Sequence, residues 1–217
     1  MDTVPRIRAA RWADKDPVAV LIADALHPSP LAAWLVPDPA QRRRILADVL
    51  VIWVEHAMFF GDIYLTDDVT AATVGFHRYR PIPPPANYGI RLADSAGPNA
   101  GRFDILEQTL SLRRPTEPHY HLAFLAVQPE AQRTGRGTAM LAHHRSRIDR
   151  VDLPSWTDTV NAQDLYARYG YTPRPTITLP NGPAIDPMRR DPDPGDDAWP
   201  LNTTRPTTTS RQQDIAI

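Results

Sequence analysis

The segment that most constrains the fold is an apolar strand followed by a glycine-containing turn and a helix. The strand is predicted over His119–Val127, and the turn, Gln-Arg-Thr-Gly-Arg-Gly-Thr, begins at Gln132. A helix is predicted over 135–150 because its apolar side chains recur at helical spacing: Met140, Leu141, His144 and Ile148. Amide groups at such a helix N-terminus point outward and favour a phosphate. The glycines could instead serve only the geometry of a tight turn, and this alternative stays open.

Composition excludes several classes of site. The 217 residues include no cysteine, so disulfides, thiolate zinc sites, iron–sulfur sites and cysteine nucleophiles are excluded. The 24 basic and 25 acidic residues leave no basic excess for nucleic acid. The N-terminus lacks the apolar region of a signal peptide, and no apolar stretch approaches the ~20 residues of a membrane span. We therefore expect a cytoplasmic protein without nucleic-acid or membrane partners.

The remaining pattern predicts one α/β (α+β) domain over 1–190, with a polar, Pro- and Thr-rich flexible tail over 191–217. Helices flank a mixed, mostly antiparallel sheet of six to seven strands. Besides the strand above, strands are predicted over 6–11, 63–66, 71–78, 155–159, 176–179 and 184–188. Besides the helix above, helices are predicted over 14–26, 41–60, 103–112 and 162–169. Pro-rich loops are predicted over 27–39 and 81–101.

Two motifs in order carry a family resemblance. Gln132-x-x-Gly135-x-Gly137 follows a strand that ends in Leu-Ala-Val, and Leu-Tyr166-Ala-Arg-Tyr-Gly170-Tyr follows about thirty residues later. The pair resembles the coenzyme A loop and the LYxxxGF motif of the GNAT acetyltransferase superfamily. Two other segments resemble its puromycin N-acetyltransferase branch: Glu117-Pro118, and Leu179–Pro183 with Met188. The resemblance runs from about residue 6 to residue 190.

The resemblance implies that acetyl-CoA is the cosubstrate and that no metal takes part. The strand end would pair with the pantetheine arm, the glycine turn would hold the pyrophosphate with charge added by Arg133 and Arg136, and Tyr166 would protonate the leaving thiolate. Asn161 lies five residues before Tyr166, where relatives have an asparagine four or seven before, so it either contacts coenzyme A or caps the following helix. The residues implied to bind acetyl-CoA are Leu125, Ala126, Val127, Gln132, Arg133, Thr134, Gly135, Arg136, Gly137, Thr138 and Asn161.

His121 is the candidate general base. Strict alternation along the strand would place it on the same face as His119, Ala123, Leu125 and Val127. An imidazole with a pKa near 6.5 suits proton transfer at neutral pH. A packed strand histidine is the alternative, and half a metal site with His119 is disfavoured because no second ligand pair has a suitable spacing.

Three further segments have two interpretations each. Trp34 and Leu35 either line the acceptor pocket, as the equivalent loop does in relatives, or anchor their loop to the core. The stretch 81–101 is either a lid over the acceptor or disordered. His143 and His144 are expected on a partly solvated helix surface.

We expect an N-acetyltransferase that moves acetyl from acetyl-CoA, by direct attack, to a primary amine of a small molecule such as an antibiotic, a xenobiotic or a biosynthetic intermediate. Acetylation of a protein amine and a non-catalytic, acyl-CoA-binding regulatory module are the alternatives. The assembly state stays open, with a homodimer as one option.

Overall fold

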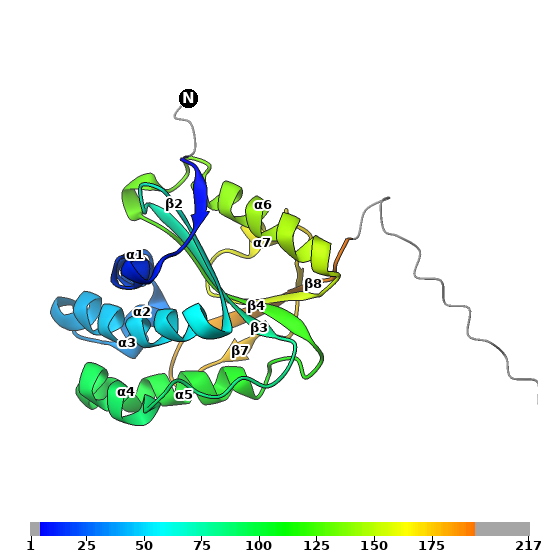
Figure 1. The fold of residues 1–217 in the computed structure, drawn as a ribbon. Coiled ribbons are helices and arrows are strands. Elements are labelled where there is room, and N and C mark those ends of the chain that lie inside the picture. The colour runs from blue at the N-terminus through cyan, green and yellow to red at the C-terminus, as the bar shows by residue number, and fades with distance from the viewer. Residues whose placement is uncertain (1–4, 194–217) are drawn as a thin grey trace, which may run out of the picture.

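A central eight-stranded sheet organises residues 5–193, the part of the chain that the computed structural model describes (Figure 1). The strand order is β1-β2-β3-β4-β5-β8-β6, and β7 pairs with β8 outside this path. Among the described strands, only β4 and β5 pair in parallel, and the other pairs are antiparallel. The strands are β1 Ile7–Ala9, β2 Gly61–Thr66, β3 Ala71–Arg78, β4 His119–Val127, β5 Ser155–Thr159, β6 Thr172–Pro173, β7 Ile177–Thr178 and β8 Ala184–Arg190. The mixed, mostly antiparallel sheet is confirmed, with one more strand than predicted because two-residue β6 is too short to show alternation.

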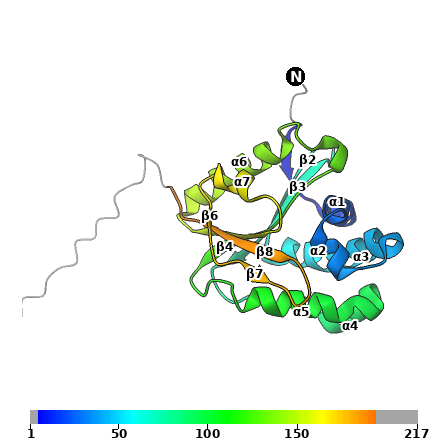
Figure 2. The same cartoon turned by 180° about the vertical axis from the view of Figure 1, so that it is seen from behind.

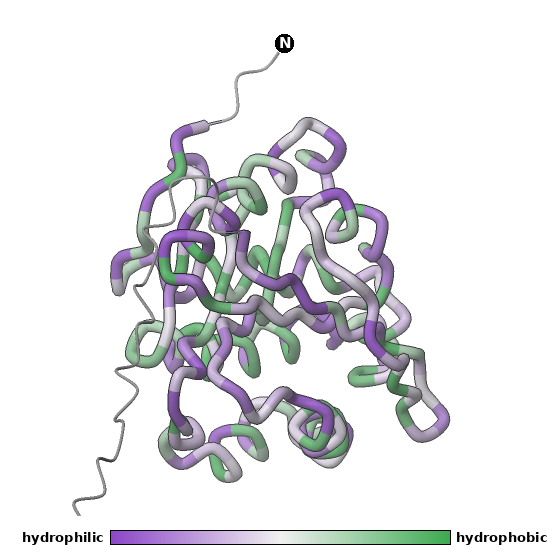
Figure 3. The backbone as a smooth tube through the Cα atoms, turned by 90° about the vertical axis from the view of Figure 1, so that its right-hand side faces the viewer, coloured by the Kyte–Doolittle hydropathy of each residue, from purple (hydrophilic) through white to green (hydrophobic). Residues whose placement is uncertain are grey.

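Helices cover both faces of this sheet (Figures 1 and 2). The helices are α1 Lys15–Leu26, α2 Pro30–Leu35, α3 Pro39–Phe60, α4 Tyr88–Ala96, α5 Ala100–Ser111, α6 Arg136–Ile148 and α7 Gln163–Ala167. One apolar core lies between β2, β3, β4 and the helices α1, α3, α4 and α5, and a second lies between β4, β8 and the helices α6 and α7. Hydrophobic segments accordingly gather in the central strands and hydrophilic ones at many of the outer turns (Figure 3). No helix within residues 5–193 combines the length and the apolar composition needed to cross a membrane.

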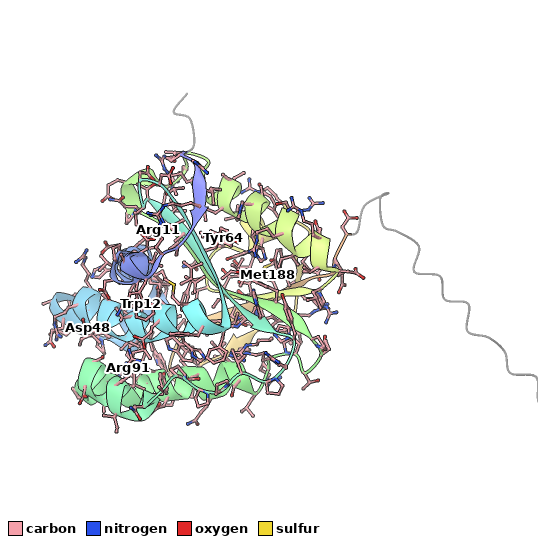
Figure 4. The ribbon with its side chains drawn as sticks, viewed as in Figure 1. Arg11, Trp12, Asp48, Tyr64, Arg91 and Met188 are labelled. Carbon is pink, nitrogen blue, oxygen red and sulfur yellow. The ribbon has the colours of Figure 1, made fainter. Side chains whose placement is uncertain are left out.

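Both Pro-rich loops contain a helix, so their assignment as loops was wrong. In 27–39, the Ser29 hydroxyl accepts from the Ala32 amide at 3.1 Å, and Pro30 occupies the first position of α2, where a missing N–H costs nothing. In 81–101, α4 buries Leu92 against the α3 side of the core. Arg91 on α4 (Figure 4) pairs with Glu55 of α3 at 3.0 Å, so this stretch is ordered.

A β-bulge in β4 overturns the predicted alternation. Val74 of β3 faces Phe124 and Gly75 faces Leu122, which leaves Ala123 without a partner. An extra residue reverses the side-chain faces beyond it. His121 therefore lies towards Phe76 in the first core, with ring centroids 6.4 Å apart, whereas Leu125 packs on the second core.

The parallel pairing of β4 with β5 ends early and creates an opening in the sheet. The last pair is Leu122 with Thr157, although β4 continues to Val127. Residues 123–127 therefore have no strand beside them on this side. The predicted tail, 191–217, lies outside the described residues from 194 onward; Asp193 still pairs with Arg145 of α6 at 3.2 Å.

Candidate active site

A cavity of about 830 Å³ lies at the opening between β4 and β5. The separated end of β4, Ala123–Val127, lines one side, and 158–162 lines the other. Strand amides and carbonyls without a neighbouring strand can pair with an extended ligand. One arm of the cavity reaches the glycine turn, and the other reaches α3, α4 and α5.

The glycine turn brings the N-terminus of α6 to the first arm. Gly135 caps α6 with φ of 88°, a left-handed conformation that favours glycine. A Cβ at Gly137 would lie 3.4 Å from Val127 Cγ2, so the turn packs closely on the end of β4. Gln132 Nε2 also donates to the Val127 carbonyl at 3.3 Å. These contacts aim the first amides of α6 at the opening.

Two of the predicted turn residues lie outside the cavity. The lining includes Gln132, Arg133, Gly135, Gly137 and Thr138. By contrast, Thr134 donates its hydroxyl to Ala131 O at 2.6 Å. Arg136 Nε donates to Thr70 Oγ1 at 2.8 Å, and its Nη2 lies 3.4 Å from Asp68 Oδ2. The expectation that the Arg136 side chain adds charge at the phosphate site is therefore wrong: it ties α6 to the β2–β3 turn.

Tyr166 lines the same arm from α7. Only 5% of it is exposed, and burial raises its pKa to about 12, so the phenol stays protonated at neutral pH. Leu125 packs on the core that contains Tyr166. Asn161 also lines the cavity but does not cap α7, because the N-cap is Ala162, whose amide donates to Thr159 Oγ1 at 3.1 Å. The cap interpretation of Asn161 was therefore wrong.

His121 and Asp158 form a pair in the cavity lining. His121 Nε2 lies 3.3 Å from Asp158 Oδ2, and both residues line the cavity. Burial lowers the pKa of His121 to about 4, although Asp158 opposes the shift. The imidazole is thus neutral near pH 7 and is a weaker base than a free histidine. Asp158 shares the β5 segment that borders the opening, and sequence patterning gave no signal for it.

His119 lies apart from this pair. Its Nδ1 meets the Glu117 carbonyl at 2.8 Å, and only 3% of the residue is exposed. Within the described chain, no three His, Cys, Asp or Glu side chains are placed to hold a metal ion. The structure thus gives His119 a packing and hydrogen-bonding role.

The second arm contains polar residues that the sequence analysis missed. They are Glu107 of α5, Arg114 in the turn that follows α5, Arg78 of β3 and Tyr88 of α4. Apolar and aromatic side chains surround them: Trp53, Phe76, Phe103, Leu106 and Leu110. Burial raises the pKa of Glu107 and of Tyr88. A signal for Glu107 existed in the sequence, since this acid falls on the apolar stripe of α5.

The structure separates two pairs of neighbouring residues that were predicted together. Leu35 lines the cavity. Trp34 instead donates its indole N–H to Pro180 O at 3.2 Å and packs on a small apolar cluster of Ile177, Leu179 and Ile185, so it is an anchor. His144 is 3% exposed, and its Nε2 lies 3.1 Å from both Ser155 Oγ and Tyr171 Oη. The prediction of a solvated His144 was wrong because that residue falls on the buried face of α6.

Comparison with known proteins finds similarity to acetyltransferases of the GNAT superfamily. Residues 104–173, from α5 to β6, match the model of the acetyltransferase (GNAT) domain. A Corynebacterium glutamicum structure described as histone acetyltransferase HPA2 and related acetyltransferase is 23% identical, with a TM-score of 0.67 over 88% of this chain and 98% of that one.

Two insect enzymes have the same fold at lower identity. Arylalkylamine N-acetyltransferase 2 from Aedes aegypti is 11% identical, with a TM-score of 0.58 over 87% of this chain and 99% of that one. Polyamine N-acetyltransferase from Drosophila melanogaster, which forms N-acetylagmatine, is 16% identical, with a TM-score of 0.56 over 86% and 99%. The chain therefore has the mixed α/β GNAT fold.

Proposed function

We propose that this protein transfers acetyl from acetyl-CoA to the primary amine of a small molecule. The observation that carries the proposal is one cavity whose lining joins the glycine turn and Tyr166 to Asp158 and to the apolar and charged residues of the second arm. Acyl transfer is the chemistry of the GNAT family, and similar structures include acetyltransferases of arylalkylamines and agmatine.

The first arm fits acetyl-CoA, which supplies an activated acetyl thioester. The backbone of Leu125, Ala126 and Val127 has no strand partner on the open side, so it can pair with an extended amide chain. The amides of 135–138 begin α6 and suit a pyrophosphate. Gly137 leaves the space that a side chain would fill, and Gln132, Arg133, Thr138 and Asn161 border the same arm.

Asp158 and His121 are proposed to receive the amine. The Asp158 carboxylate can accept an N–H of the incoming amine directly or through water. The neutral His121 holds that carboxylate by the 3.3 Å contact. The proposed base is thus the pair, in place of His121 acting alone.

Tyr166 is proposed to act as the acid. In the transfer, a bond forms between the amine nitrogen and the acetyl carbon, and the carbon–sulfur bond breaks. The amine proton passes to the Asp158 side, and the Tyr166 hydroxyl supplies a proton to the leaving sulfur, so the products are an amide and a free thiol. The chain needs no covalent intermediate, in keeping with a sequence without cysteine.

The decisive experiment measures thiol release from acetyl-CoA with and without a panel of small primary amines. We expect amine-dependent release, and we expect Asp158→Asn to lower kcat by about 10²-fold or more. An Asp152→Asn variant, in the turn before β5, is the matched control and keeps full activity. Coenzyme A binding without any amine-dependent release would favour the alternative of a non-catalytic regulatory module.

The identity of the amine is a separate question. Glu117-Pro118 and the Leu179–Pro183 segment favour an acceptor of the kind that puromycin N-acetyltransferases use, such as an antibiotic or a biosynthetic intermediate. The second arm is lined by residues of α3, α4 and α5 inside the fold, which favours a small molecule over a protein amine. Peptides that present an amine at a chain end or a lysine should accordingly be poor acceptors in the same assay.

A further inference from the structure

Two arginines line the second arm without an acidic partner. No carboxylate of residues 5–193 lies within 4.0 Å of the guanidinium nitrogens of Arg78 or Arg114. Arg78 Nε is also buried without a hydrogen-bond partner. Two other arginines that lie at least partly inside the protein have an acidic partner: Arg190 meets Asp149 at 2.6 Å, and Arg147 meets Asp62 at 2.8 Å.

Arg78 and Arg114 are both half-buried. Burial and the nearby charge of Arg114 lower the pKa of Arg78 to about 10, and burial also lowers the pKa of Arg114. Both guanidinium groups stay charged at neutral pH. Partial burial of a cation without an acidic partner has a free-energy cost, and an anion that binds there offsets part of that cost.

The neighbouring acidic side chains do not pair with Arg78 or Arg114. Asp158 is engaged by His121, and Glu107 lies beside Tyr88 with its pKa raised by burial. Glu107 acts on both arginines, and Asp158 on Arg114, only at longer range. The space between Arg78 and Arg114 is thus available to an anionic group of a ligand, close to the proposed amine site at Asp158.

The other residues that line the second arm suit an apolar part of a ligand. Trp53 packs edge-on against Tyr88 and Phe76, with ring centroids 5.3 and 6.2 Å apart. Phe103 and Leu106 of α5 complete this wall. A ligand here would place a hydrocarbon or aromatic group against these rings.

We propose that the acceptor is an amino acid with an apolar side chain, or a close relative that carries both a primary amine and a carboxylate. Arg78 and Arg114 bind the carboxylate, Asp158 receives the amine, and the aromatic wall receives the side chain. This proposal rests on the proposed acetyl transfer and names its substrate class. Arginine is suited to the task because its planar fork matches a carboxylate.

The test uses pairs of amines that differ only in the carboxylate: phenylalanine with phenethylamine, tryptophan with tryptamine, and leucine with isoamylamine. We expect kcat/KM for the amino acid of at least one pair to exceed that of its partner by about 10-fold or more, since a charged hydrogen-bonded pair is lost without the carboxylate. Arg78→Gln and Arg114→Gln should each lower kcat/KM for that amino acid by about 10- to 100-fold and change the rate with its decarboxylated partner by less than about threefold. Arg113→Gln, at the exposed neighbouring position, is the matched control and should change neither rate.

Two results would overturn the proposal. In one, the decarboxylated amines react as fast as the amino acids, or faster; in the other, the two cavity variants slow both members of a pair equally. If no amine releases thiol, the proposed acetyl transfer fails, and calorimetry then decides the carboxylate site alone. Binding of the same amino acids to the wild type with coenzyme A, lost in Arg78→Gln, supports the site; no binding to the wild type refutes it.

Discussion

Replacing the buried His144 by leucine tests how burial sets the acid stability of this fold. Burial lowers the pKa of His144 to about 3 in the folded protein, against 6.5 for an exposed histidine. The folded state therefore takes up fewer protons than the unfolded state as the pH falls. The stabilisation is fully present above about pH 6.5 and is lost progressively below it, down to about pH 3.

The size of the effect follows from the two pKa values. One pKa unit corresponds to about 1.4 kcal/mol, so at about pH 5 the wild type loses about 2 kcal/mol relative to about pH 7.5 because of His144. A loss of 2 kcal/mol is a large share of a typical unfolding free energy of about 5–15 kcal/mol. The leucine variant lacks this loss and keeps the 2.7 Å hydrogen bond between Ser155 and Tyr171.

Urea unfolding of both proteins at the two pH values measures the effect. The unfolding free energy of the wild type minus that of His144→Leu should fall by about 2 kcal/mol between about pH 7.5 and about pH 5. Ser155→Ala is the matched control, because it removes a partner of the same imidazole without removing a titrating group. A wild-type minus variant difference that stays constant within about 0.5 kcal/mol would refute a neutral, buried His144.

Further predictions concern the site and the sheet. Tyr166→Phe should lower kcat by about 10²–10⁴-fold and leave the KM for acetyl-CoA within about threefold. The control, Tyr79→Phe on the surface, should leave both constants unchanged. An unchanged kcat in Tyr166→Phe would remove Tyr166 from proton transfer. Gly137→Val should abolish coenzyme A binding in calorimetry while circular dichroism shows a folded protein; retained affinity would mean that the turn does not hold the pyrophosphate. Gly75→Ala should destabilise the fold by about 1–3 kcal/mol in urea unfolding, because a Cβ there overlaps the Tyr120 ring; wild-type stability would show that the ring moves freely. Removal of 191–217 should leave the rate of acetyl transfer unchanged, and loss of that rate in a folded variant would assign the tail a part in the reaction.

The sequence determined the elements whose patterns are local. Strands β4 and β5 have the predicted bounds. In β4 the reason is a long run of mostly apolar residues, several of them strand-forming, with a clear start and end. The glycine turn after β4 and the helix after it were also predictable, since a left-handed cap at Gly135 and the spacing on α6 leave a direct mark in the sequence. The proline at the start of α2 is also a helix-start signal, but four prolines within residues 27–39 favoured a loop.

The tertiary structure decided which of these residues meet. The bulge at Ala123 reverses the faces of β4, and it depends on pairing with β3, which no pattern within β4 records. Arg78, Arg114 and Asp158 come from three separate segments and gather only because the sheet opens beside Leu122. The sequence does not show whether a charged residue on a strand or in a loop will have an oppositely charged partner in the folded protein. Only the packed structure shows that two arginines were left without one, because pairing depends on distances between segments far apart in the chain.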